Sequence, residues 1–263
     1  MVTFKVGHSA IPFTYTVPMG TSRIFVITVT VVVFGAVMLA VAGLGYQQEW
    51  WTLKTAFTLL KWAAWLGIAG TFLSVIGLAF VRPAGRHTLG FSLALVVALA
   101  TVWMPWSWKQ RAGGVPPIHD ITTDTQDPPP FVAILPLRAN AKNKAEYGGD
   151  SVAAKQRVAY PDIQPVTFAV PPAEAFTRAK HAAEGMGWTM VATDSASGRI
   201  EATATTRFFK FKDDIVIRVR PADAGVGAAS RVDVRSVSRV GRSDVGTNAA
   251  RIRIYVMRLR AQS

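Results

Sequence analysis

Three long apolar runs fill the first part of the chain, and each is long enough to cross a bilayer. They cover residues 24–45, 62–81 and 88–104, and the third stops at Pro105. A helix needs about 20 residues to span the hydrocarbon core, with a range of about 17–25. The pattern predicts a membrane domain over residues 1–108 with three spans. A cleaved signal peptide is the alternative for the first run, but that run is longer than a usual signal-peptide core, and two further spans follow it.

In the rest of the chain, apolar residues recur at the spacings of amphipathic helices and of strands, which is typical of a soluble domain. In residues 173–186 the apolar side chains fall on one face at 100° per residue, which predicts an amphipathic helix after Pro171-Pro172. Residues 249–260 predict a closing helix with Ile252, Val256 and Leu259 facing inward. Apolar and alternating patterns predict five strands, at 166–170, 188–192, 199–206, 215–220 and 231–240.

Short turns separate the last four of these strands, including a turn at 221–227, and they predict an antiparallel meander. The expected fold class is therefore three transmembrane α-helices followed by an α+β two-layer domain over residues 151–263. Its antiparallel sheet of about five strands carries two helices on one face, in a helix-grip-like arrangement.

A stretch rich in proline and aspartate joins the two parts. Residues 113–117 and 127–130 cannot be helical, because proline removes a backbone donor and restricts the residue before it. A free linker would not need apolar side chains, yet this stretch has five: Ile118, Ile121, Phe131, Ile134 and Leu135. We therefore expect residues 109–150 to form an extended tether laid on the domain.

Composition separates the two parts further. The chain has 263 residues, no cysteine and a formal net charge of +13. Residues 1–108 hold six Lys/Arg and one acid, whereas residues 109–263 hold 23 Lys/Arg and 15 acids. The absence of cysteine excludes disulfides and cysteine-ligated zinc. A charged fraction of 17% is low for a soluble protein, for which about 25% is usual.

Loop charges give the expected orientation. Four cations flank the spans on each side, Lys5, Arg23, Arg82 and Arg86 against Lys54, Lys61, Lys109 and Arg111, so counting alone decides nothing. The short loop 82–87 carries two arginines, which favours a cytoplasmic N-terminus and a periplasmic C-terminal domain in the cell inner (plasma) membrane. Seven tryptophans gather on the other side of the spans, which is typical of an aromatic belt.

The outward positions of the last two strands are basic, with Arg218, Arg220, Arg231, Arg235 and Arg239 alongside Asp233. A solvated face is the plain interpretation. The alternatives are the acidic tether lying across it, anionic lipid, or an acidic envelope protein. Nucleic acid is not an expected partner, because this face lacks an aromatic stacking platform. The loop 208–212, with three phenylalanines and two lysines, either closes the core or dips into the membrane interface.

Two polar motifs are candidate sites. The first is a cluster where the last strand meets the last helix: Arg239, Arg242, Ser243, Asp244, Asn248 and Arg251. It reads either as a helix cap, with Ser243 at the N-cap and Asp244 paired with Arg251, or as an anion- or partner-binding site at a helix start.

The second motif lies in the tether and contains His119, Asp120, Thr123 and Asp124. The more specific interpretation of this motif is a metal site or a general base. Asx and threonine turns explain the same residues structurally, and one histidine is a poor ligand set. The sequence has no nucleophile triad, phosphate loop or paired-carboxylate signature. We therefore predict no catalytic residue, no metal and no cofactor.

The stretches IHDITTDTQDPP at 118–129 and SRVGRSDVGTNAARI at 238–252 resemble the domain of unknown function 1499 (DUF1499) family of bacterial and plastid proteins. The resemblance covers about residues 115–260, and it implies no established function. The sequence therefore predicts an integral membrane protein that presents an extracytoplasmic, non-catalytic binding or structural domain to the cell envelope. The alternative is a membrane-anchored enzyme or transport accessory that uses the loop of His119, Asp120 and Asp124.

Overall fold

The computed structural model describes residues 19–80, 86–222 and 229–262, and the chain divides into two compact units. One unit holds the chain up to Gly45 and Trp51–Pro105; the other holds Tyr46–Trp50 and the chain from Trp106 onward. Lys5, Arg82 and most of the expected turn at 221–227 lie outside the described residues.

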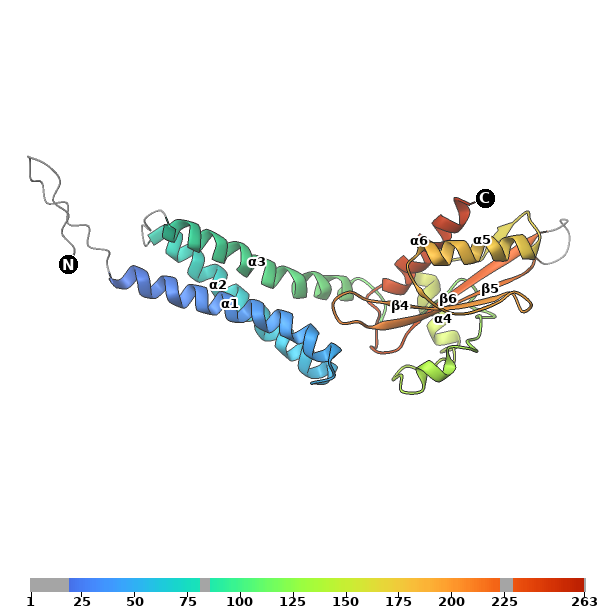
Figure 1. The fold of residues 1–263 in the computed structure, drawn as a ribbon, viewed down its shortest axis with the longest axis horizontal. Coiled ribbons are helices and arrows are strands. Elements are labelled where there is room, and N and C mark those ends of the chain that lie inside the picture. The colour runs from blue at the N-terminus through green and yellow to red at the C-terminus, as the bar shows by residue number, and fades with distance from the viewer. Residues whose placement is uncertain (1–18, 81–85, 223–228, 263) are drawn as a thin grey trace, which may run out of the picture. The chain divides into compact units, whose positions relative to one another are not determined.

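Three helices dominate the first unit: α1 (Met19–Gln47), α2 (Leu53–Phe80) and α3 (Arg86–Gly113) (Figure 1). The last residues of α1 and of α3 belong to the second unit. Their most apolar windows have mean hydropathies of 2.9, 1.9 and 1.8, so each is a candidate membrane span. The expectation of three spanning helices is confirmed at this level. The expected stop at Pro105 is wrong, because α3 continues to Gly113. A proline inside a helix removes one hydrogen bond and clashes with the carbonyl four residues earlier, but spanning helices tolerate this loss.

Small residues let these helices approach closely. Gly67, Gly70 and Ser74 lie on the buried stripe of α2. A Cβ on Gly70 would lie 2.5 Å from the Val32 side chain of α1, and one on Gly67 would lie 2.7 Å from the Val102 side chain of α3. Larger residues at these two positions would therefore push the helices apart.

The second unit is built on one antiparallel sheet of six strands in the order β1-β6-β5-β4-β3, and β2 also pairs with β6. The strands are β1 (Asp120–Thr122), β2 (Val166–Phe168), β3 (Thr189–Asp194), β4 (Arg199–Thr205), β5 (Lys212–Pro221) and β6 (Ser230–Ser238). The predicted meander of β3 to β6 is confirmed. The additional strand is β1, which the tether supplies by pairing Asp120–Thr122 with β6.

Helices α5 (Pro172–Gly185) and α6 (Thr247–Arg260) pack on one face of this sheet, as predicted (Figure 1). Alternation in β5 directs Ile215, Ile217 and Val219 toward the helices. The alanines of α5 and the side chains of Ile252, Tyr255 and Leu259 in α6 complete the main core. Tyr255 is fully buried and donates a hydrogen bond of 3.0 Å to the carbonyl oxygen of Ala179.

The tether covers the opposite face of the sheet. Phe131 and Ile134 are buried against Val216 of β5 and Val237 of β6, which forms a second small core. Ile118 and Ile121 are also buried, as expected, whereas Leu135 begins the short 3-10 helix η1 (Leu135–Arg138) and is 45% exposed. Four of the five apolar residues in this stretch are thus buried, and its first residues, 109–113, belong to α3.

Helix α4 (Asp150–Ala159) has no counterpart in the sequence-based prediction. Only Ala153 and Gln156 are buried in it, so the segment lacks the apolar stripe by which a helix is recognised. Its main link to the sheet is polar: the Gln156 amide accepts from the backbone N–H of Thr122 and donates to the Thr122 carbonyl. α4 thereby satisfies backbone groups of the edge strand β1.

Candidate functional site

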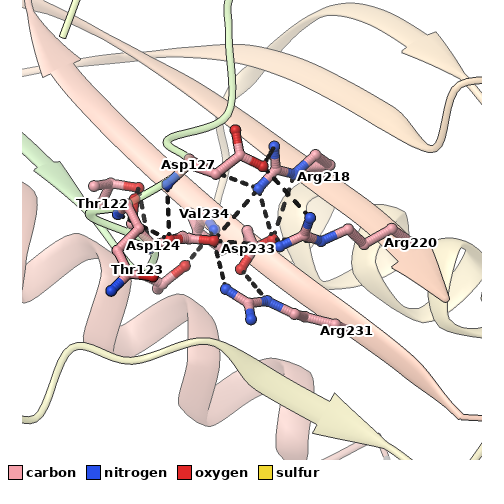
Figure 2. A network of polar contacts seen from close by, with 10 residues as sticks. Thr122, Thr123, Asp124, Asp127, Arg218, Arg220, Arg231, Asp233 and Val234 are labelled. Carbon is pink, nitrogen blue, oxygen red and sulfur yellow. Dashed lines mark hydrogen bonds and ion pairs between the residues drawn. The ribbon is translucent and has the colours of Figure 1, made fainter. Parts of the chain in front are cut away.

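The face of β5 and β6 that lies opposite the helices, named here the tether-covered face, carries a network of three arginines and three aspartates (Figure 2). Arg218 lies 2.9 Å from Asp127 and 3.0 Å from Asp233, and Arg231 binds both Asp233 and Asp124. Arg220 lies 3.3–3.4 Å from the same three carboxylates. Three positive charges therefore meet three negative ones, and two of the aspartates belong to the tether.

Asp124 also orders the turn in which it stands. Its second carboxylate oxygen accepts the backbone N–H groups of Gln126 and Asp127, both at 3.0 Å. Just before it, Thr123 exchanges backbone and side-chain hydrogen bonds with Val234 of β6. These contacts have the form of the Asx and threonine turns considered from the sequence. The tether motif therefore fixes the tether to the sheet.

Two buried carboxylates continue the network. Asp120 accepts two hydrogen bonds from Arg235, of 2.9 and 2.7 Å. Asp214 of β5 binds Arg138 from η1 at 2.6 Å and Arg239 at 2.8 Å. Each of the five outward arginines expected on the basic face is thus bound to a carboxylate. Of the interpretations considered from the sequence, the structure matches the one in which the acidic tether lies across this face.

Glu201 has a related role in β4. Its buried carboxylate accepts the backbone N–H groups of Val132, Ala133 and Ile134 at 2.8–3.1 Å and lies 3.1 Å from Arg199. These backbone donors precede η1 and would otherwise be unpaired. Sequence reasoning missed Glu201, Asp213, Asp214 and Arg138. A usable signal was present, because Glu201 and Asp214 occupy the outward positions of strands whose inward positions are apolar.

The cluster where β6 meets α6 is brought together, but its pairing differs from the expected one. Asp244, rather than Ser243, caps the helix: its carboxylate accepts the backbone N–H groups of Gly246 and Asn248 at 2.9 and 2.6 Å. The helix begins at Thr247, three residues after Asp244, following Gly246 with φ of 76°. Ser243 accepts only the N–H of Val245, at 3.2 Å. The left-handed glycine delays the helix, so the serine lies too early to cap it.

Arg251 binds Asp213 at 2.6 Å rather than Asp244. It also contacts Asn248, whose amide binds Ser236 and Ser238 of β6 and the carbonyl oxygen of His119. A buried cluster of hydrogen bonds thus joins the last helix to β6 and the tether. Arg242 is exposed and makes no hydrogen bond or ion pair within the described part of the chain.

Burial changes the pKa of two groups near these contacts. It raises the pKa of Asp244 above the ordinary range, although the two backbone hydrogen bonds oppose the shift. It also raises the pKa of Tyr147 to about 12, with a smaller contribution from nearby Asp120. The Tyr147 hydroxyl is buried and has no hydrogen-bond partner among the residues that the structure describes.

A polar cavity of about 360 Å³ opens beside the tether. It lies between the turn of Asp124, the α4 residues Gln156 and Arg157, the 160–165 segment and Arg231 of β6. Two arginines and one aspartate give this lining a net positive charge. Its volume falls within the range of about 300–1,000 Å³ that is common for small-molecule sites.

The tether residues do not form a ligand set of their own. Asp120 and Asp124 bind different arginines, and the carbonyl oxygen of His119 accepts hydrogen bonds from Ser238 and Asn248. Among residues 19–80, 86–222 and 229–262, no group of three His, Cys, Asp or Glu is placed to hold a metal ion.

Comparison with known proteins finds one family. The family model described as a protein of unknown function (DUF1499) matches residues 120–259, which is more than half of the chain. The match runs from β1 almost to the end of α6, so it contains the helix-start cluster and the tether motif apart from His119, and it leaves out the three apolar helices. No curated protein matches the sequence.

Proposed function

Because the chain belongs to the DUF1499 family of proteins of unknown function, we propose a role from the geometry of its domain: an integral membrane protein that presents a non-catalytic binding or structural domain to the cell envelope. The three apolar helices supply the anchor. We place the anchor in the cell inner membrane, the N-terminus in the cytoplasm and the C-terminal domain in the periplasm.

The use of the buried carboxylates is the observation that carries this proposal. Asp120, Asp213, Asp214 and Asp233 are each less than 5% exposed, and each binds an arginine. Glu201 binds three backbone amides and Arg199. The oxygens of these carboxylates are thus occupied by guanidinium and backbone N–H donors within the domain. This arrangement supports a structural use of the acids and favours binding over acid–base catalysis.

Within the helix-start cluster, we propose that Arg239, Ser243, Asp244, Asn248 and Arg251 hold α6 to the sheet, and that Arg242 provides the outward contact to an anion or partner. The polar cavity beside Asp124 is the candidate site for a small polar ligand, since Arg157 and Arg231 both line it. The proposed partners are the bilayer and an acidic envelope component, and no nucleic acid.

Reporter fusions test the proposed side of the membrane. Alkaline phosphatase fused after Ser263 should be active, and green fluorescent protein at the same place should be dark. Insertion of either reporter into the loop 82–87 should give the opposite result. A fluorescent C-terminal fusion with inactive phosphatase would contradict the periplasmic placement.

Metal content tests the alternative of an enzyme or transport accessory. The full chain, purified in detergent, should contain no stoichiometric metal by mass spectrometry. Metal that is present at one equivalent, is lost in His119→Ala and is retained in the control His181→Ala would overturn the non-catalytic proposal. His181 suits the comparison because it lies exposed on α5.

A further inference from the structure

Six exposed cations gather at one end of the sheet, and we propose that this end docks on anionic lipid headgroups of the bilayer in which the chain is anchored. The six are Lys142, Lys144, Arg207, Lys210, Lys212 and Arg242, named here the basic end. The proposal requires membrane anchoring but does not depend on which side of the membrane the domain occupies.

Backbone hydrogen bonds around Arg239 bring these segments together. Its N–H donates to the carbonyl oxygen of Lys212 at 2.9 Å, and its own carbonyl accepts from the N–H of Asn143 at 3.0 Å. The Asn143 amide donates to Gly241 at 2.9 Å, directly before Arg242. The loop of Lys210 closes through two hydrogen bonds between Thr206 and Phe211, both of 2.9 Å. Three loops that are distant in sequence therefore share this end.

The same end is joined to the chain as it leaves α3. The N–H of Asp244 donates to the carbonyl oxygen of Ile118 at 3.2 Å. The Ser243 hydroxyl donates to the carbonyl oxygen of Pro116 at 3.5 Å. Pro116 is three residues past Gly113, the last residue of α3. An extended residue spans at most about 3.6 Å, so this connection is short. Lys109 and Arg111 in the last turns of α3 are exposed cations as well.

The charges at the basic end are available, in contrast to those of the tether-covered face. The side chains of the six cations make no hydrogen bond or ion pair within the residues described. Asp213 and Asp214 stand beside them but are buried and bound to Arg251, Arg138 and Arg239. Glu146 is the exposed acid that comes next along the tether after Lys144.

The residue types also suit a headgroup surface. The tether-covered face uses arginines, whose planar guanidinium groups fit fixed carboxylates, whereas four of the six cations at the basic end are lysines on flexible stems. Leu137, whose carbonyl oxygen accepts from Arg239, adds an apolar side chain that is 55% exposed. Lysines beside exposed apolar side chains are typical of interfacial membrane contact. Charge complementarity therefore favours an anionic bilayer surface as the partner.

Hydrogen exchange of the full chain in nanodiscs tests this docking. Peptides covering 140–145, 206–213 and 239–244 should exchange at least threefold more slowly in discs containing phosphatidylglycerol than in phosphatidylcholine discs. The protection should vanish in about 0.5 M salt, where the Debye length is only a few ångströms. It should also be reduced in Lys142→Gln/Lys210→Gln and unchanged in the control Lys155→Gln/Lys180→Gln, which removes two exposed cations from α4 and α5.

Two results would overturn the proposal. Equal exchange in both kinds of disc would show that the basic end does not contact anionic headgroups. Protection produced by inorganic phosphate in phosphatidylcholine discs, without anionic lipid, would show a small-anion site instead. Neither result bears on the reporter fusions, so failure of this inference can be distinguished from failure of the proposed topology.

Discussion

Arg235 of β6 holds Asp120 of β1 through both carboxylate oxygens, and both side chains are almost completely buried. The guanidinium also donates to the carbonyl oxygens of Pro129 and Ala145 and lies 5.2 and 5.5 Å from the ring centres of Phe131 and Tyr147. One arginine thus fixes three parts of the tether to the last strand.

Removing one partner of this pair should be costly. We expect Asp120→Ala to lower the free energy of unfolding by about 3–5 kcal/mol, because it leaves a buried guanidinium without its counter-charge. Urea unfolding of the domain within the detergent-solubilised chain measures the change. Asp162→Ala, which removes an exposed partner of Arg253, should cost about 1 kcal/mol or less. Equal losses in the two variants would contradict a buried pair.

Glu201→Gln should loosen the tether locally. Glutamine keeps one acceptor oxygen, but its NH2 group is a donor and cannot accept the backbone N–H groups that the replaced carboxylate oxygen accepts. We expect a loss of about 3 kcal/mol, together with faster hydrogen exchange in residues 131–138. Glu174→Gln, on the exposed face of α5, should change stability by about 0.5 kcal/mol or less. Unchanged exchange in 131–138 would refute the anchoring role.

The stability of the domain should depend on pH through Asp244, and the direction of this dependence follows from its pKa. Because burial raises its pKa, the folded state binds this proton more tightly than the unfolded chain does. The resulting stabilisation is complete below the unfolded pKa of about 3.9 and is lost as the pH rises through the folded value. Asp244→Asn keeps one acceptor oxygen but does not titrate, so it lacks this pH-dependent stabilisation. Its stability should therefore rise relative to that of the parent between pH 4 and pH 7.

Asp162 supplies a control of opposite sign. Its hydrogen bonds to Arg253 lower its pKa, so its stabilising contribution is present above the unfolded pKa and is lost as the pH falls. Asp162→Asn should therefore be less stable than the parent by a nearly constant amount between pH 4 and pH 7, and this difference should shrink as the pH falls below about 4. Parallel curves for the parent and Asp244→Asn, measured by urea unfolding at each pH, would contradict the expected shift.

Tyr147→Phe should be tolerated. The hydroxyl of Tyr147 is buried without a partner among the described residues, so removing it relieves a desolvation cost while the ring stays beside Arg235. We expect unchanged stability or a gain of up to about 1 kcal/mol in thermal melts. Tyr255→Phe deletes a hydroxyl that donates to Ala179 and should lose about 1 kcal/mol. A clear loss in Tyr147→Phe would reveal a hydrogen bond that this structure does not contain.

The apolar periodicities were sufficient to predict the spans, the meander and the two helices on its inner face, because burial imposes them residue by residue. Pairing among charges was harder to predict. Arg251 was expected beside Asp244, seven positions away, but binds Asp213, which is 38 positions earlier in the chain. Such partners depend on the register between strands. α4 was missed for a related reason, since its contacts with the sheet are largely polar.

The pairing of β1 with β6 also constrains how the domain reaches its native state. Asp120 and Arg235 are 115 positions apart, and β6 is an interior strand that pairs with β1, β2 and β5. Contacts of such long range close late and slow folding. During synthesis the tether emerges well before its partner strand, so β1 stays unpaired until residues 230–238 are available. Chains interrupted before β6 would expose apolar tether residues and an unpaired strand edge, the features by which incomplete domains aggregate or are degraded.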